Sequence, residues 1–419
     1  MSEARNLSID GGRLWASIME MAKIGATVKG GCNRLALTDL DREARDLFAG
    51  WCRDASCTIR IDQMGNIFAR RAGLDDTLAP VVTGSHLDTQ PTGGKFDGVY
   101  GVLAGLELIR SLNDLGYQTK RSIEVVVWTN EEGCRFPPSM VASGVFAGKF
   151  SLAEAYAVTD PDGVTLGDAL ARIGYAGDEA VGRHPIHAYF EAHIEQGPIL
   201  EAEGKTIGVV TGAQGMRWYE VTLTGAESHA GTTPMERRKD ALLGAARLIA
   251  LVNGIALAGA PDARLTVGMI EAFPNSRNVI PGQTFCTIDT RHPVDATLTA
   301  LDADLRDGIG AIAADMGLEL EIEEILYSPP VTFDADCVAA VADAAAATGH
   351  ASMQIVSGAG HDACNIAAVA PAAMIFIPCV DGISHNEIEH ASQADCAAGC
   401  EVLLHAVLAK AGEAGNDAC

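Results

Sequence analysis

The sequence is poor in aromatic residues and in positive charge. Phe, Trp and Tyr make up 5% of its 419 residues although 48% are hydrophobic, so the core has to be built mainly from aliphatic side chains. Lys and Arg number 30 against 55 Asp and Glu, which gives a formal charge of −25. Because nucleic acids and anionic membranes are bound by basic surfaces, this imbalance argues against both as partners.

Segments for export or membrane insertion are also lacking. Met1–Asp10 is polar and has no apolar h-region, and no uninterrupted run of about 18 apolar residues occurs. The eleven cysteines, from Cys32 to Cys419, form no CxxC pair, which in a chain without an export signal favours reduced, partly buried thiols. We therefore expect a cytoplasmic protein that spans no membrane.

The order of the predicted elements indicates an α/β domain. Apolar and β-rich runs alternate with helical patterns, and strand–helix–strand order predicts a mixed, largely parallel sheet with ligands at the carboxyl ends of its strands. The predicted helices are 14–24, 38–52, 98–113, 335–348 and 392–411, and the predicted strands are 58–62, 80–87, 122–128 and 372–377.

A different order interrupts this domain. Strand, helix, strand, strand, helix and strand are predicted at 217–223, 238–253, 263–270, 283–289, 298–316 and 319–326. This βαββαβ order is typical of a ferredoxin-like domain. We therefore expect a discontinuous first domain, residues 1–212 and 328–419, and an inserted second domain, residues 213–327.

Imidazoles and carboxylates gather where predicted strands end. His86 and Asp88 stand two residues apart at one strand end, so their side chains share a face. Asp97 follows in a glycine-rich loop that lets the backbone fold back toward them. Glu131 and Glu132 come directly after the next strand. Each feature alone is commonly structural, but together they suit divalent metal ions.

Two isolated histidines extend this set. His193 ends a short β-like run, and His385 follows a buried apolar strand. Alone, each would more often be a structural histidine, but in this company each can complete a metal site. Adjacent carboxylates on a turn point in different directions, so one of Glu131 and Glu132 can bind metal while the other moves protons. This division of roles suits metal-assisted hydrolysis.

The order and the sequences of these motifs resemble those of the amidase/hydantoinase/carbamoylase branch of the M20 family of two-metal hydrolases. The chain is similar in particular to N-carbamoyl-L-amino-acid hydrolases, β-ureidopropionases and allantoate amidohydrolases, from about Ile61 to Ile388. The motifs are His86-x-Asp88, Asp97-Gly98, Glu131-Glu132-Gly133, His193-x-Glu195-Gln196-Gly197-Pro198 and Ser384-His385-Asn386-Glu387.

The resemblance implies a di-metal catalytic domain with an inserted lid and dimerisation domain, and a homodimer formed through that insert. Two divalent ions per subunit are expected, Zn²⁺ foremost, with Mn²⁺, Co²⁺ or Ni²⁺ as alternatives. Glu131 is then the general base, and Asp88 orients the ligand His86 without binding metal itself. The implied metal ligands are His86, Asp97 as the bridge, Glu132, His193 and His385.

Substrate contacts are implied in both domains. Asn278 and Arg291 hold the substrate carboxylate, for which the planar guanidinium is suited. His229 stabilises the oxyanion at the reacting carbonyl, from the same or the other subunit. The pocket is completed by Gln196, Gly360 and His361.

The expected reaction is hydrolysis of the linear C–N bond of an N-carbamoyl-L-amino acid to the amino acid, CO₂ and NH₃. A metal-bridging water is the nucleophile and Glu131 the proton carrier. Allantoate amidohydrolase and β-ureidopropionase are alternatives with the same chemistry. The sequence of residues 193–198 resembles the amidohydrolase branch and disfavours a peptidase. A catalytically silent metal-binding scaffold is also disfavoured, because structural zinc prefers closed cysteine-rich sites.

Overall fold

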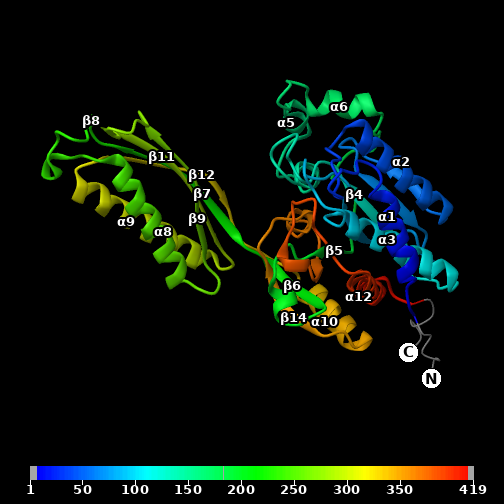
Figure 1. The fold of residues 1–419 in the computed structure, drawn as a ribbon. Helices are drawn as coiled ribbons and strands as arrows, with labels where there is room; N and C mark the ends of the chain where they lie inside the picture. The colour runs from blue at the N-terminus through cyan, green and yellow to red at the C-terminus, as the bar shows by residue number, and fades with distance from the viewer. Residues whose placement is uncertain (1–6, 183, 414–419) are drawn as a thin grey trace. The chain divides into compact units, whose positions relative to one another are not determined.

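The chain forms two compact units in the computed structural model, which describes residues 7–182 and 184–413. Unit 1 comprises Met1–Gly212 and Thr332–Cys419, and unit 2 comprises Ala213–Val331 (Figure 1). Strand β12 (Glu319–Ser328) ends two residues beyond its predicted end, and unit 2 ends at Val331. Cys419 and the first six residues of the polar N-terminus lie outside the described residues.

Unit 1 is built around a nine-stranded sheet with the order β1-β2-β4-β3-β5-β15-β6-β13, in which β14 pairs with β6. Its central strands β4 (Ile123–Trp128), β3 (Val81–His86), β5 (Ala188–Ile194) and β15 (Ala372–Ile377) run parallel and are buried throughout. Burial on both faces accounts for their near-continuous apolar sequences. The mixed, largely parallel sheet predicted from the sequence is confirmed.

The outer strands of this sheet run antiparallel to their neighbours where β1 meets β2, β2 meets β4, and β6 meets β15. Their bounds are β1 (Thr58–Ile61), β2 (Ile67–Arg71), β6 (Ile207–Ala213), β13 (Val331–Thr332) and β14 (Ser352–Ser357). Strands β2 and β6 were not predicted as separate elements.

Long helices of unit 1 pack on the sheet and on one another. Helix α3 (Val99–Asp114) contacts β3, β4 and β5, and it also contacts α1 (Gly11–Met21) and α12 (Gln393–Ala411). Helix α10 (Ala335–Thr348) lies beside α12 and β15. Helix α2 (Asp39–Asp54) is capped by Thr38, whose side chain accepts the Asp41 N–H.

Shorter helices complete unit 1. They are α4 (Val141–Phe146), α5 (Leu152–Ala157), α6 (Leu166–Ile173), α7 (Ile199–Ala202), α11 (Asp362–Ile366) and the 3₁₀ turn η2 (Val380–Gly382). Helix α11 contacts α4, β5 and β15. It therefore belongs to the set of elements that surrounds the ends of the central strands.

Unit 2 has the predicted βαββαβ order around a four-stranded antiparallel sheet, β12-β7-β11-β9. Besides β12, its strands are β7 (Gly215–Thr224), β9 (Arg264–Phe273) and β11 (Gln283–His292). Helices α8 (Ala241–Ala258) and α9 (Asp295–Met316) lie side by side on one face of this sheet (Figure 1). A separate two-stranded ribbon joins β8 (Ser228–His229) to β10 (Val279–Ile280), and η1 (Met235–Arg237) precedes α8.

Helix α8 alone, among the described residues, is long and apolar enough to cross a membrane. Length and composition of one helix are weak evidence, because a helix that covers a sheet passes the same test. Leu248 and Val252 are buried in the core of unit 2, and Arg247 pairs with Asp315 of α9 at 2.7 Å. These contacts place one side of α8 on the core of unit 2, and five of its eighteen residues are buried.

The ten described cysteines are free, and eight of them are buried. Burial raises the pKa of Cys57 to about 11 and that of Cys337 to about 12. A thiol with so high a pKa carries little thiolate near neutral pH and reacts slowly. The expectation of buried, reduced thiols therefore holds for this part of the chain.

Candidate active site

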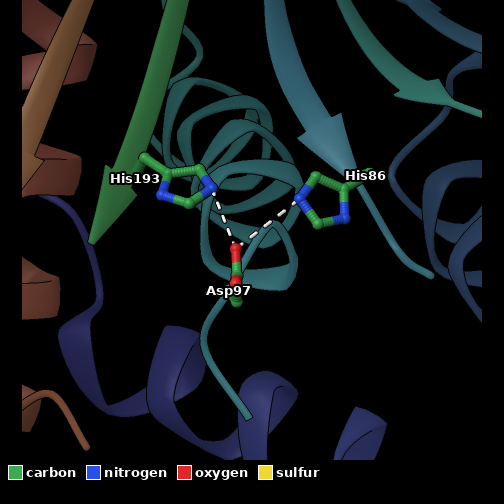
Figure 2. A group of neighbouring side chains, drawn as sticks. All are labelled: His86, Asp97 and His193. Carbon is green, nitrogen blue, oxygen red and sulfur yellow. Dashed lines mark ion pairs between the residues drawn. The ribbon is translucent and has the colours of Figure 1, made fainter. Parts of the chain in front are cut away.

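His86 and His193 meet at the carboxyl edge of the central sheet. His86 is the last residue of β3 and His193 the penultimate residue of β5, and these strands are parallel neighbours. Asp97 reaches both from the loop before α3 (Figure 2). Its Oδ1 lies 3.6 Å from His86 Nε2 and 3.2 Å from His193 Nε2. The parallel strands therefore fix the positions of the two histidines, and the loop before α3 supplies the aspartate.

Gly98 makes this approach possible. Its φ is +66°, and a Cβ atom there would lie 2.4 Å from the imidazole of His86. No other residue fits both the left-handed backbone and the contact. The Gly98 N–H also donates to His193 Nε2 at 3.3 Å. The glycine-rich loop thus brings Asp97 between the two histidines.

The hydrogen bonds of the two Nδ1 atoms show which ring nitrogens of His86 and His193 are available for a metal. His86 Nδ1 lies 2.9 Å from the carbonyl oxygen of Asp88, and His193 Nδ1 lies 2.9 Å from that of Ile194. Since a carbonyl oxygen only accepts, each Nδ1 carries a proton. Both Nε2 atoms then turn toward Asp97 Oδ1, and three electron-rich atoms converge. Such a set requires a proton or a metal cation, and backbone-anchored histidines are typical metal ligands.

A second group gathers around the other oxygen of Asp97. His385 Nε2 lies 3.4 Å from Asp97 Oδ2 and 3.6 Å from Glu132 Oε2. In each of these two groups the candidate ligand atoms lie within 4.8 Å of one another, as they do in a third group of Glu191, His193 and His361. The two oxygens of one carboxylate therefore face two separate sets, which is the geometry of a bridging ligand. Imidazole and carboxylate donors in these numbers fit two divalent cations.

Protonation within the cluster is shifted by burial and by charge pairing. Burial alone would raise the pKa of the Asp97 carboxyl, but hydrogen bonds from His193, His385 and His86 hold it well below its usual range. Burial lowers the pKa of His86, yet the charges of Glu131 and Asp97 raise it well above normal overall. The cluster therefore favours positive charge where a divalent cation would bind. Such an ion would be held by neutral imidazole and carboxylate.

Asp88 supports the paired glutamates as well as His86. Its fully buried carboxylate accepts the backbone N–H groups of Glu131 at 3.3 Å and of Glu132 at 3.2 Å. The expected orientation of His86 comes from the Asp88 carbonyl, since the carboxylate oxygen is 3.9 Å from Nδ1. The turn after β3 brings the carbonyl closer to the ring than the side chain. Asp88 therefore fixes the turn on which the two glutamates stand.

The two glutamates point in different directions. Glu131 Oε2 lies 3.5 Å from His86 Nε2, whereas Glu132 accepts the Gln90 backbone N–H at 3.0 Å and its side-chain amide at 2.6 Å. Among the described residues, the metal-ligand groups include Glu132 and not Glu131. Burial raises the pKa of Glu131 well above its usual value, partly offset by His86. A raised pKa suits a carboxylate that accepts and returns protons.

Three predicted pocket residues lie around this cluster. Gln196 Nε2 donates to Asp97 Oδ2 at 2.9 Å and lies 3.3 Å from His385 Nε2. His361 packs edge-on against His193 with 4.5 Å between ring centroids, and burial lowers its pKa well below normal. Gly360 lies against the thioether of Met140. His361 thus packs against a candidate ligand histidine, and its burial favours the neutral ring.

The other predicted substrate residues belong to unit 2. His229 and Val279 pair across the β8–β10 ribbon, and the Ala230 N–H donates to the Asn278 carbonyl at 2.9 Å. The structure thus brings His229 and Asn278 together. Arg291, on β11, forms an ion pair with Asp289 at 2.8 Å.

Two buried carboxylates near the ligands were not predicted. Glu191 accepts hydrogen bonds from Ser85 Oγ at 2.6 Å and from the Ala363 N–H at 2.9 Å. It stands two residues before His193 on β5, so strand periodicity could have placed it on the same face. Glu389 follows His385 by four residues and holds two loops together. No pattern in the sequence marks that contact.

Comparison with known proteins agrees with this arrangement. Residues 82–409 match the model of the peptidase family M20/M25/M40. The N-carbamoyl-L-amino-acid amidohydrolase of Rhizobium meliloti is 53% identical over 403 residues, which cover 96% of this chain and 97% of that protein. The allantoate amidohydrolase of Bacillus subtilis is 37% identical over 388 residues, which cover 91% and 93%.

A solved structure gives the same result. An amidase of the hydantoinase/carbamoylase family from Burkholderia multivorans is 63% identical, with a TM-score of 0.95, and the match covers 97% of this chain and 98% of that one. Matches of this extent include both units and the loops that carry the histidines and carboxylates. The chain therefore belongs to the peptidase family M20/M25/M40 and is a hydrolase of its hydantoinase/carbamoylase branch.

Proposed function

We propose that this enzyme hydrolyses the linear C–N bond of an N-carbamoyl-L-amino acid to the amino acid, CO₂ and NH₃. The observation that carries the proposal is the position of Asp97 between two ligand groups, with Glu131 beside them. The name of the relative from Rhizobium meliloti supports this substrate class. The chemistry needs no nucleophilic side chain, because water attacks the ureido carbonyl.

Five side chains would hold two divalent ions, with Zn²⁺ as our first choice. They are His86, Asp97, Glu132, His193 and His385. When bound, such ions lower the pKa of water and polarise the carbonyl of the substrate. Glu131 accepts the proton of the attacking water and delivers it to the leaving nitrogen. Asp88 keeps Glu131 in place through the backbone N–H that it accepts.

Unit 2 supplies the substrate contacts in this proposal. Arg291 and Asn278 would bind the substrate carboxylate, and His229 would stabilise the oxyanion. The ion pair with Asp289 orients the Arg291 guanidinium before the substrate arrives. Unit 2 then acts as a lid, and Gln196 contacts the substrate beside Asp97.

Allantoate is the alternative substrate, because the enzyme from Bacillus subtilis is also a relative. A panel of N-carbamoyl-L-amino acids, N-carbamoyl-β-alanine and allantoate, assayed with Zn²⁺, Mn²⁺, Co²⁺ or Ni²⁺, separates these substrates. Fastest turnover of an N-carbamoyl-L-amino acid is the expected result. Fastest turnover of allantoate would replace our proposal, and an inert chain would favour a catalytically silent scaffold.

We also propose a cytoplasmic homodimer that forms through unit 2. Edge strand β9 carries three exposed apolar side chains, Met269, Ile270 and Phe273, each with more than 40% of its surface accessible to solvent. The opposite edge, β12, carries four glutamates in its ten residues, and like charges on an edge discourage pairing. The apolar β9 edge is therefore our choice for pairing with a second copy.

Replacing Glu131 by Gln should abolish nearly all turnover and leave the metal content unchanged, because the base is lost while the ligands remain. We expect kcat to fall by about 10²–10⁴-fold, with metal measured by atomic absorption. The exposed Glu203→Gln is the matched control and should be unaffected. Near-normal kcat in a metal-loaded Glu131→Gln variant would remove Glu131 from the mechanism.

Removing one histidine from each ligand group should remove one ion. His86→Ala and His385→Ala are each expected to lower the bound metal by about one ion per chain, because neither group keeps enough donors. His350 contacts Glu401 and belongs to neither group, so His350→Ala serves as the control. Full metal content in both ligand variants would show that the ligands are misassigned.

Changing Arg291 to Lys should weaken recognition of the substrate carboxylate. A charged hydrogen bond contributes about 1.5–3 kcal/mol, so kcat/KM should fall by at least about tenfold when the planar fork is lost. Binding of a carboxylate-free ureido analogue should not change. Arg247→Lys, at another ion pair of unit 2, is the control. Equal losses with both ligands would make Arg291 a purely structural residue.

A charge on the β9 edge should separate the dimer. We expect sedimentation velocity to give a dimer for the wild-type protein and a monomer for Ile270→Lys, because an unpaired charge at this edge opposes strand pairing. Ile325 is similarly exposed on β12, and Ile325→Lys should remain dimeric. A monomeric wild type, or a dimeric Ile270→Lys, would contradict this interface.

A further inference from the structure

Glu389 joins two loops that carry metal-ligand residues. The residue is 4% exposed. Its Oε1 accepts the backbone N–H groups of Phe96 and Asp97, each at 3.1 Å. Its Oε2 accepts the hydroxyl of Ser384 at 2.8 Å, directly before His385. One carboxylate therefore connects the backbone of the Asp97 loop to the His385 loop, across 292 residues of sequence.

The Asp97 loop leaves room for this carboxylate. A Cβ atom on Gly94 would lie 2.1 Å from Glu389 Oε1 and 2.3 Å from its Cδ. Any side chain at position 94 would therefore displace the carboxylate or the loop. The glycine and the glutamate fit together as one contact, although they belong to distant parts of the chain.

The two ligand groups differ in how they are supported. His86 and His193 stand on β3 and β5, whose spacing is set by pairing within the sheet. His385 stands on an irregular segment, with a left-handed φ of +53°. Its distance from Asp97 Oδ2 is not set by strand pairing. Glu389 is one of the contacts that fix it, together with Gln196, whose amide donates to Asp97 Oδ2 at 2.9 Å and to Ser384 Oγ at 3.1 Å.

We propose that Glu389 is a positioning residue that holds Asp97 and His385 at the separation needed for the second metal ion. Glu389 is not itself a ligand in this role. It acts through its hydrogen bonds to the Asp97 peptide N–H and the Ser384 hydroxyl. The inference rests on the two-metal function proposed above. It goes beyond that function because it assigns the affinity of one ion to a residue that is not a ligand.

A second buried carboxylate provides a matched control. Glu107 is fully buried and connects α3 to the N-terminal segment, accepting hydrogen bonds from the Asp10 N–H at 3.1 Å and from Arg13 Nε at 2.8 Å. It also accepts the Ser111 hydroxyl at 2.8 Å. Its partners include no candidate ligand. Loss of Glu107 tests what a missing buried carboxylate does to the fold alone.

Glutamine at position 389 separates hydrogen bonding from charge. Its carbonyl oxygen can still accept the N–H groups of Phe96 and Asp97. Its amide can donate to Ser384 Oγ, which lies 3.3 Å from Asp97 Oδ2 and can donate there instead. The Gln variant therefore keeps both loops connected, whereas Ala disconnects them.

The test is a titration of the full-length, metal-free protein with Co²⁺, followed by calorimetry and by the visible absorption of the bound ion. The wild-type protein should bind two equivalents. In Glu389→Ala the second equivalent should weaken by about 10–100-fold, as is typical when the support of a ligand is removed. The first equivalent should keep its affinity and spectrum. Glu389→Gln should restore the second equivalent, and Glu107→Ala should bind both normally.

Three results would overturn the inference. The second equivalent could bind Glu389→Ala as tightly as wild type, both equivalents could weaken equally in Glu389→Ala and Glu107→Ala, or Gln could fail to restore binding. Should Glu389→Ala not fold, Ser384→Ala removes one arm of the contact and should weaken the second equivalent alone. A wild-type protein that binds one ion would instead overturn the two-metal function, and this inference with it.

Discussion

The site depends on a concentration of carboxylates that are almost entirely buried. Asp88, Asp97 and Glu131 are each at most 8% exposed, and burial of an ionised carboxylate is strongly unfavourable unless a cation or hydrogen bonds compensate. Backbone N–H groups compensate Asp88, and imidazoles compensate Asp97. The surrounding strands, glycines and carbonyl contacts all serve to hold these opposite charges at short range. This balance is what makes the cluster a candidate metal site.

Much of this arrangement could be predicted, because local patterns carry it. The apolar runs that become β3 and β4 end at His86 and just before the Glu131–Glu132 pair, and parallel strands put such ends at one edge. The βαββαβ order of unit 2 follows from periodicity alone. The helix 335–348 and the strand 372–377 agree with α10 and β15 to the residue.

Contacts between distant segments could not be predicted in this way. Nothing in the residues near Glu389 indicates that its carboxylate meets the peptide of Asp97, 292 positions away. The role of Asp88 was anticipated only in outline, since a sequence does not tell whether a carbonyl or a carboxylate faces a ring. Strand β12 also ends beyond its predicted position, because its end is set by pairing with β7 rather than by a change of composition.

The segment from Gly94 to Gly98 is enclosed on two sides. At one end the carboxylate of Glu389 lies where a Cβ atom would be, and at the other the imidazole of His86 does. Random mutagenesis aimed at a new substrate will therefore find few tolerated changes here, however close the segment is to the chemistry. Libraries directed at unit 2 vary residues that no ligand side chain constrains. The part of the enzyme best suited to redesign is thus the one that contributes none of the candidate metal ligands.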